Sequence, residues 1–142
     1  TLQLRHRFGL GLLNEAQQMA VGGDELYICD SINDRLQVFS LTGEHRRSIV
    51  GEWRSPTRLS FAKDRLYLLE QSNRDAPVQR RRILVLSLQG DILQVVTHPT
   101  EPTAVFHSIC CFDHKLLARY QYYTESAGTR PSKYGMLALQ GL

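Results

Sequence analysis

The sequence predicts an all-β fold built from repeated four-stranded antiparallel units, and two observations support this prediction. Within residues 25–43, two short runs rich in β-branched and aromatic residues, 26–29 and 36–39, are separated by an Asp/Ser/Asn-rich turn. Runs of the same kind recur at intervals of about 40 to 50 residues. This spacing, with four short strands in each unit, is typical of the blades of a β-propeller.

The second strand of the unit recurs most clearly. Residues 36–43 return as residues 83–90 and again as residues 134–141, and each copy ends with Gly. The first strand, 26–30, returns as 66–70 and, more loosely, as 116–120. A Gly at the end of each second strand suits a tight turn into a further strand, because Gly tolerates positive φ.

The pattern Asp-Ser-x-Asn-x-Arg-Leu-Gln-Val-Phe at residues 30–39 resembles the NHL-repeat family, whose blades are named for an Asn-His-Leu tripeptide. The second repeat has Glu70 in place of the Asp, and the third keeps only the strand pattern and the Gly. The resemblance covers nearly the whole chain. It implies a propeller, most often of six blades, that recognises proteins or RNA and is frequently one domain of a larger chain such as a ubiquitin ligase.

The 142 residues fit one domain, a partial propeller. Its expected parts are an orphan outer strand at 1–8, a first blade at 15–50, a second at 56–97, and a third at 103–142 that lacks its outer strand. About three blades cannot close a ring, because propellers close with roughly four to eight. We therefore expect half of a six-bladed ring, with the remaining blades supplied either by the same longer chain or by a second copy.

Composition excludes little. The formal net charge of +3 is mild and indicates no partner by itself. No run of about 18 apolar residues is present, so no membrane partner is expected. The three cysteines do not form a disulfide framework, which favours a reducing, cytoplasmic compartment.

Function is expected at the end of the blades that carries the connections from the second to the third strand of each blade and the connections between blades, because the long connections fall there. The segments at this end are rich in basic and aromatic side chains, the types enriched at binding hot spots. The expected contact residues are Trp53, Arg54, Arg74, Arg80, Arg81, Arg82, Tyr122, Tyr123, Arg130 and Lys133.

Three interpretations of this basic and aromatic set stay open. The set suits recognition of a protein partner, and it also suits single-stranded RNA, through phosphate contacts and base stacking. It can equally be a solvated surface whose arginines keep the protein soluble. Asp30, Asn33 and Arg35 are expected to be structural, with the acid and the amide binding turn N–H groups.

Catalysis finds no support in the sequence. His107, Cys110, Cys111 and His114 are zinc-type ligands, but adjacent cysteines on a strand point to opposite faces, so no metal site is expected. The expected inner strands, 16–21, 57–61 and 104–108, contain no carboxylate, and no nucleophile or phosphate-binding motif is present. We expect a binding scaffold without cofactors. The alternative is a propeller enzyme of the lyase or lactonase kind whose site lies in the blades that this chain lacks.

Overall fold

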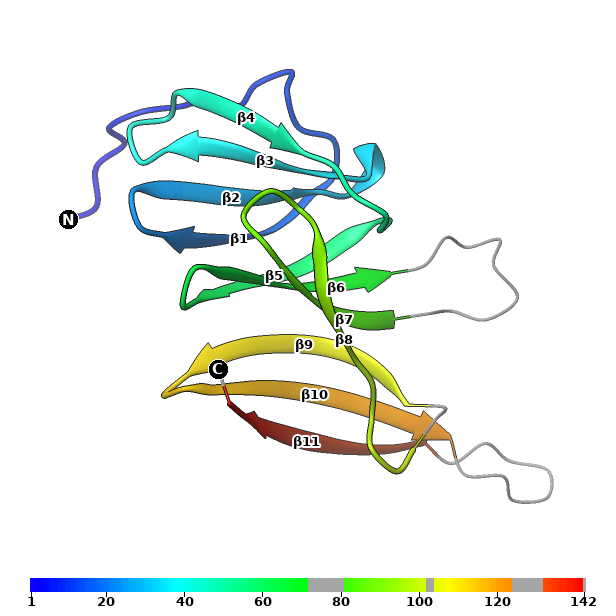
Figure 1. Cartoon of the computed structure of the whole chain (residues 1–142). Helices are drawn as coiled ribbons and strands as arrows, with labels where there is room; N and C mark the ends of the chain where they lie inside the picture. The colour runs from blue at the N-terminus through cyan, green and yellow to red at the C-terminus, as the bar shows by residue number, and fades with distance from the viewer. Residues whose placement is uncertain (72–80, 102–103, 124–131, 142) are drawn as a thin grey trace.

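The computed structural model describes residues 1–71, 81–101, 104–123 and 132–141, and these form three antiparallel β-sheets (Figure 1). The all-β prediction is therefore confirmed. No helix in the described ranges is long and apolar enough to cross a membrane.

Each sheet follows the order of its strands in the sequence. The first contains β1 (Ala16–Gly22), β2 (Glu25–Asp30), β3 (Arg35–Ser40) and β4 (His45–Ile49), with a 3-10 turn, η1 (Ser31–Asn33), between β2 and β3. The second contains β5 (Pro56–Ala62), β6 (Arg65–Gln71), β7 (Arg81–Leu86) and β8 (Ile92–Val96), and the third contains β9 (Val105–Phe112), β10 (Lys115–Tyr123) and β11 (Ser132–Gln140). The inner strands expected at 16–21, 57–61 and 104–108 overlap β1, β5 and β9.

Two-residue turns join the first two strands of each sheet. In the second sheet Lys63 and Asp64 both have positive φ, at 47° and 55°, and in the third Asp113 and His114 have 46° and 59°. Positive φ at both central residues is typical of type I′ hairpin turns, whose twist matches that of the flanking strands.

The sheets stack face to face, and two hydrophobic cores fill the spaces between them. Successive apolar side chains of β6 and β7 point to opposite faces of the second sheet, so that each strand contributes to both cores. The first core joins the first and second sheets through Tyr27, Cys29, Leu36, Val38, Ile49, Trp53, Leu59, Leu66, Leu68, Leu84 and Leu86. The second joins the second and third sheets through Tyr67, Leu69, Ile83, Val85, Val96, Phe106, Ile109, Leu116 and Ala118.

The first strands of the three sheets lie side by side. β1 contacts β5, and β5 contacts β9, so these strands form the common edge along which the sheets meet (Figure 1). Two side-chain bonds connect them. Gln18 Oε1 accepts a hydrogen bond from Leu59 N at 3.1 Å, and Ser60 Oγ accepts one from Cys111 N at 2.9 Å. The relative positions of the three inner strands are therefore fixed by polar bonds as well as by packing.

The predicted strand at 1–8 is wrong for this structure, because residues 1–9 belong to no strand. A strand needs a hydrogen-bonded neighbour, and the segment has none among the described residues. Its end packs instead on the outward face of the first sheet. The rings of Phe8 and Phe39 lie 5.4 Å apart, and Leu13 covers a small core of Leu26, Ile28 and Phe39.

The third repeat is also offset from its predicted alignment. Glu25 pairs with Ser40 in the first sheet and Lys115 with Gln140 in the third, which makes Ser40 and Gln140 equivalent. The alignment of 36–43 with 134–141 in the sequence makes Gln140 equivalent to Thr42, two residues away from Ser40. The two-residue offset keeps every side chain on its correct face, because side chains alternate with a period of two.

Candidate functional site

One end of the stacked sheets carries the connections that lead from the second to the third strand of each sheet. β2, β6 and β10 end there and β3, β7 and β11 begin there, on the right in Figure 1. The connections between sheets, which precede β5 and β9, reach the same end. We call this end the loop face, and it is the one that the sequence favours for function.

In the first sheet the loop face is held by a buried carboxylate at the end of β2. Asp30 Oδ1 accepts hydrogen bonds from Asn14 N at 2.6 Å and from Asn33 Nδ2 at 3.1 Å, and Oδ2 is bonded to Arg35 Nε at 2.6 Å. Burial opposes ionisation of Asp30, but the bonds from Asn14, Asn33 and Arg35 together lower its pKa. Asp30 thus joins the segment before β1, the turn and the start of β3. These contacts support a structural role for Asp30, Asn33 and Arg35, although the Asn33 amide binds the Asp30 carboxylate and not a turn N–H as expected.

Glu70 makes the same arrangement in the second sheet. Its Oε1 accepts a hydrogen bond from Arg54 N at 2.9 Å, and its Oε2 binds Arg82 Nε at 2.6 Å. Arg54 lies two residues before β5, as Asn14 lies two residues before β1, and Arg82 pairs with Glu70 in the ladder as Arg35 does with Asp30. Arg82 is therefore part of a structural clamp that the first and second sheets share.

The third sheet replaces this charged clamp with an aromatic one. Tyr120 occupies the position of Asp30 and Glu70, and it pairs with Gly135 where the other sheets have Arg. The Tyr120 ring occupies the space that a side chain at Gly135 would need, since a Cβ there would overlap the ring. The His98 ring packs edge-on against Tyr120 with centroids 4.3 Å apart. The backbone N–H of Ala104, equivalent to that of Asn14, is bonded to Glu101 O at 3.0 Å instead of to a carboxylate.

A further set of bonds connects the first sheet to the second at the loop face. Asp34, which has a φ of 51°, accepts a hydrogen bond from Ser55 N at 2.7 Å and pairs with Arg54 at 3.2 Å. Ser31 Oγ donates to Pro56 O. The turn after β2 is therefore tied to the segment that begins the next sheet.

The contact residues expected from the sequence differ in how exposed they are in the structure. Trp53 is 1% exposed and donates from Nε1 to Gly90 O at 3.2 Å, so its assignment to a contact surface is wrong: it belongs to the first core. The Arg54 side chain is 71% exposed, Lys133 is exposed and Tyr122 is half-buried. Arg74, Arg80 and Arg130 lie outside the described residues, and the side chains of Arg81 and Tyr123 lie outside the described side chains.

A pocket of about 280 Å³ opens between the inner strands near the loop face. Sequence analysis missed it, because its residues are far apart in the chain. Two apolar residues, Leu69 and Phe106, form part of its wall. The polar lining comes from all three sheets, and we call this site the inner pocket: Gln17, Thr57, Arg58, Gln71, His107 and Arg119.

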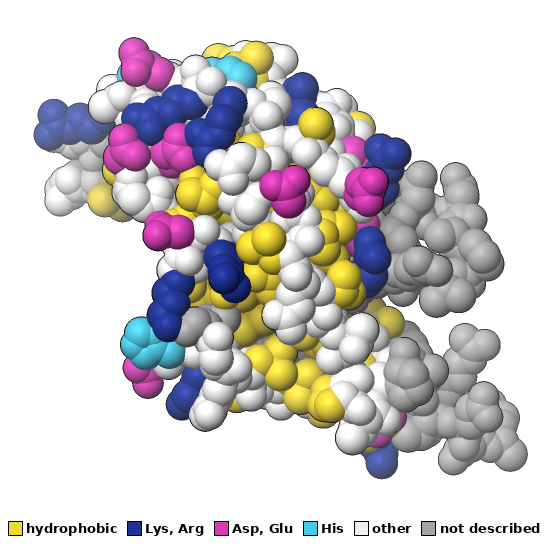
Figure 2. Space-filling view, in the orientation of Figure 1, with side chains coloured by type: hydrophobic (Ala, Val, Ile, Leu, Met, Phe, Trp, Pro, Cys, Tyr) yellow, Lys and Arg dark blue, Asp and Glu magenta, His cyan; other side chains and the backbone are white. Residues whose placement is uncertain are grey.

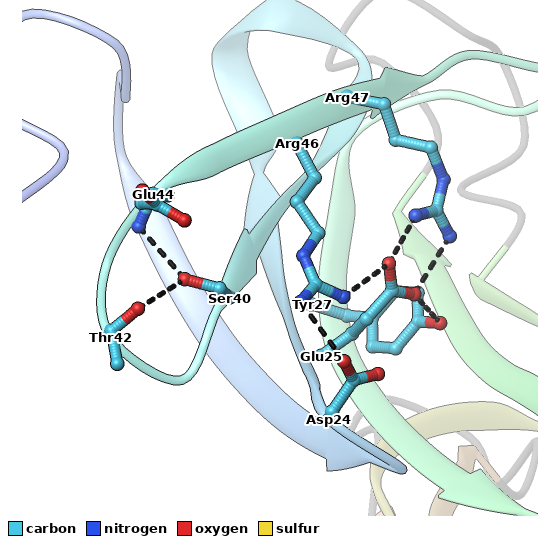
Figure 3. Close-up of polar contacts among 8 residues, drawn as sticks. All are labelled: Asp24, Glu25, Tyr27, Ser40, Thr42, Glu44, Arg46 and Arg47. Atoms are coloured by element: carbon cyan, nitrogen blue, oxygen red, sulfur yellow. Dashed lines mark hydrogen bonds and ion pairs between the residues drawn. The ribbon is translucent and has the colours of Figure 1, made fainter.

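The opposite end of the first sheet carries charges that neutralise one another (Figure 3). Glu25 accepts hydrogen bonds from Arg47 at 2.9 Å, Arg46 at 3.3 Å and the Tyr27 hydroxyl at 2.6 Å, and Asp24 binds Arg46 at 2.9 Å. These bonds, Arg47 foremost, lower the pKa of Glu25 to about 2. Figure 2 shows Lys and Arg beside Asp and Glu over the first sheet, with hydrophobic side chains across the middle of the view.

The cysteines and histidines singled out in the sequence do not converge. Cys110 is exposed and pairs with Leu117, whereas Cys111 is half-buried against the second core, so the two point to opposite faces as expected. His107 Nε2 lies 3.0 Å from Gln121 Oε1. Within the described part of the chain, no group of three or more His, Cys, Asp or Glu is placed to hold a metal ion.

Comparisons with known proteins add no family to these observations. No family model matches the sequence, and no curated protein matches it.

Proposed function

We propose that the chain is an arc of an NHL-like β-propeller and serves as a non-catalytic scaffold that binds a protein partner at its loop face. The repeated clamp carries this proposal. Asp30 and Glu70 each fix the beginning and the end of the connections at the loop face to the sheet. A rigid base under long connecting segments is the arrangement that recognition surfaces commonly use.

The stacking of the sheets supports the propeller part of the proposal. The second sheet repeats the first at an interval of 40 residues. The clamp carboxylates Asp30 and Glu70 are 40 residues apart, and so are Glu15 and Ser55, which both have positive φ. The first strands meet along one edge, as strands do around a propeller axis. Half of a six-bladed ring is the arc that three such sheets suggest.

A protein partner is favoured over RNA by the aromatic residues. Sequence-tolerant binding of single-stranded RNA uses aromatic rings on which the bases stack. Two of the aromatic residues expected at the loop face have described side chains: Trp53 is buried, and Tyr122 is half-buried with its ring 6.1 Å from that of Tyr120. Exposed basic groups such as Arg54 and Lys133 remain, and they suit acidic side chains of a protein.

The test is a selection of binding peptides from a displayed random library on the immobilised chain. We expect enriched peptides to be acidic, and the double variant Arg54→Ala/Lys133→Ala to weaken their binding at least tenfold. The matched control Arg5→Ala/Arg65→Ala removes the same charge away from the loop face and is expected to change affinity less than twofold. Unchanged melting temperatures are expected for both variants, since these side chains are exposed.

RNA binding is the outcome that would replace this proposal. A single-stranded oligonucleotide bound more tightly than any selected peptide, with affinity falling steeply as salt rises, would assign the loop face to nucleic acid. Peptides enriched equally by the Arg54→Ala/Lys133→Ala variant would show that recognition lies elsewhere on the molecule.

A further inference from the structure

Each inner strand carries one extra residue at the same place. In the ladder of β5 with β6, Pro56 pairs with Glu70 and Arg58 with Leu69, so Thr57 has no partner of its own. In β9, Phe106 pairs with Tyr120 and Ser108 with Arg119, which leaves His107 as the extra residue. β1 shows the same shift between Ala16 and Met19. Such β-bulges bend a strand and change the direction of a side chain, and they are frequent beside functional sites.

The three bulges are equivalent positions of the repeat. In each inner strand one residue pairs with Asp30, Glu70 or Tyr120. The residue that follows it is Gln17 in β1, Thr57 in β5 and His107 in β9. All three of these residues line the inner pocket. Three sheets therefore repeat one backbone irregularity and direct three different polar groups to one place, which a purely structural bulge does not require.

The walls of the inner pocket are fixed before any ligand arrives. Gln18 is bonded to Leu59 N and Ser60 to Cys111 N, and these bonds join β1 to β5 and β5 to β9 beside the pocket. The Arg58 side chain is oriented by a hydrogen bond from its guanidinium to Thr57 O at 2.8 Å. A site whose groups are already placed loses less conformational entropy on binding.

The charge of the inner pocket is of one sign. Arg58 and Arg119 line it, and none of its described lining residues is a carboxylate. Neither guanidinium forms an ion pair with a described Asp or Glu, whereas Arg35, Arg46, Arg47, Arg54 and Arg82 all do. Guanidinium groups bind carboxylate and phosphate oxygens in a bidentate way, so an oxyanion is the ligand group that matches.

The size of the pocket and its polar lining indicate a small hydroxylated molecule. Its volume of about 280 Å³ lies near the lower end of small-molecule sites. Leu69 and Phe106 are each 2% exposed, so they close the floor of the pocket and leave its accessible surface to the polar groups. Gln17, Thr57 and Gln71 supply amide and hydroxyl groups that pair with hydroxyls of a ligand.

We propose that the inner pocket binds a small organic anion that carries a carboxylate or phosphate group on a short, hydroxylated carbon skeleton. This proposal goes beyond the recognition of a protein at the loop face and does not depend on it. The bound anion would bridge the first strands of all three sheets.

The experiment is calorimetric titration of the chain with malate, inorganic phosphate and uncharged glycerol. We expect saturable one-to-one binding of malate or phosphate and none of glycerol. Tighter binding of malate assigns the site to carboxylates, and tighter binding of phosphate assigns it to phosphate esters. Amide NMR signals of Gln17, Thr57 and His107 are expected to shift together on saturation, while that of Asp64, in the turn at the other end of β5, stays in place.

Matched variants separate a built site from general attraction of anions. Arg58→Gln/Arg119→Gln is expected to weaken binding at least tenfold, and Arg5→Gln/Arg7→Gln, which removes the same charge elsewhere, less than twofold. Gln17→Leu keeps both guanidinium groups and is expected to weaken binding at least threefold.

An absence of saturable binding, or equal losses in the two double variants, would overturn the inner-pocket proposal. Neither result bears on the acidic peptides selected at the loop face, whose binding is expected to survive Gln17→Leu. Competition between a selected peptide and malate for the chain would identify the anion as an acidic side chain of the partner, and would overturn the small-molecule assignment.

Discussion

At the scale of single residues, acid–arginine contacts do two different things in this chain. Asp30 and Glu70 are nearly inaccessible, and each binds an arginine and a backbone N–H, so loss of either carboxylate removes both contacts at once. Because the two guanidinium groups are about 30% exposed and reach water, we expect such a loss to cost about 1 to 3 kcal/mol of the free energy of unfolding. Arg54 and Asp34 pair at the surface, where an ion pair contributes about 1 kcal/mol or less.

Glu25 gives the clearest dependence on pH. Its pKa falls from 4.5 to about 2 on folding, because Arg47, Tyr27 and Arg46 donate to its carboxylate. A folded-state pKa below the unfolded one stabilises the protein above pH 4.5, and the stabilisation is lost as pH falls toward 2. We expect Glu25→Gln to lower the free energy of unfolding by about 2 kcal/mol at pH 6. The difference from wild type should shrink between pH 4.5 and pH 3.

Urea denaturation across this range measures the Glu25 effect. The control is Glu44→Gln, since the Glu44 side chain is exposed and its carboxylate forms no ion pair with the described residues. Wild-type and Glu25→Gln curves that stay parallel down to the lowest pH at which the protein folds would contradict the role assigned to Glu25.

At the scale of elements, the segment between β4 and β5 joins the first sheet to the second. Trp53 lies in this segment, fills the first core and reaches the β7–β8 turn through Gly90 O. We expect Trp53→Ala to lower the free energy of unfolding by about 3 to 5 kcal/mol, through the cavity and the unpaired carbonyl. Trp53→Phe should cost less, because most of the apolar volume remains.

Fluorescence offers a direct measurement, because Trp53 is the only tryptophan. Its emission should be blue-shifted and poorly quenched by acrylamide in the folded protein, and denaturation curves of a tyrosine or far-UV signal report the variants. Val50→Ala is the control, since Val50 is 67% exposed, and should change stability by about 0.5 kcal/mol at most. Strong quenching of Trp53 in the native state would contradict its burial in the first core and would support its assignment to the contact surface.

The sequence predicts the strands well because the information for them is local. Alternating apolar residues and turn residues recur in every unit, and strand bounds follow from them. The direction of Trp53 is not local information, since it depends on a turn 37 residues away in the next sheet. The inner pocket depends on three bulges, and a bulge adds one residue without any characteristic residue type at Gln17, Thr57 or His107. The clamp of the third sheet could not be predicted from the repeat, because Tyr120 and Gly135 replace a carboxylate and an arginine.

At the scale of the whole molecule, the two ends of the stack differ. The outward face of the first sheet is covered in part by Leu13 and Phe8. The outward face of the third sheet exposes Phe112, Tyr134 and Met136 at 70%, 64% and 64%. The nine residues of β11 also form the outer edge of their sheet, which has three strands among the described residues, whereas β4 and β8 supply a fourth strand to the other sheets. An edge of this length and an apolar face beside it favour association.

We propose that residues 2–8 of a second copy pair with this edge. With the repeat of 40 residues, Arg5, His6 and Arg7 correspond to His45, Arg46 and Arg47 of β4, the outer strand of the first sheet. Leu2 and Leu4 alternate along it and are 102% and 71% exposed, so they are free to pack on a neighbour. Two copies related by a twofold axis would each add the missing strand to the other and complete six blades.

Sedimentation of the isolated chain tests this assembly. We expect a discrete dimer that becomes monomeric when residues 1–8 are deleted, because each strand added to β11 supplies both backbone hydrogen bonds and apolar contact. Alkylation of Cys110 provides a second measurement, since this thiol is exposed on the outward face of the third sheet, whereas Cys29 is buried with its pKa raised to about 12. Cys110 should react more slowly in the dimer than in the shortened chain, and Cys29 slowly in both. A well-folded monomer with a fully reactive Cys110 would contradict exchange between copies, and would leave the remaining blades to the same longer chain.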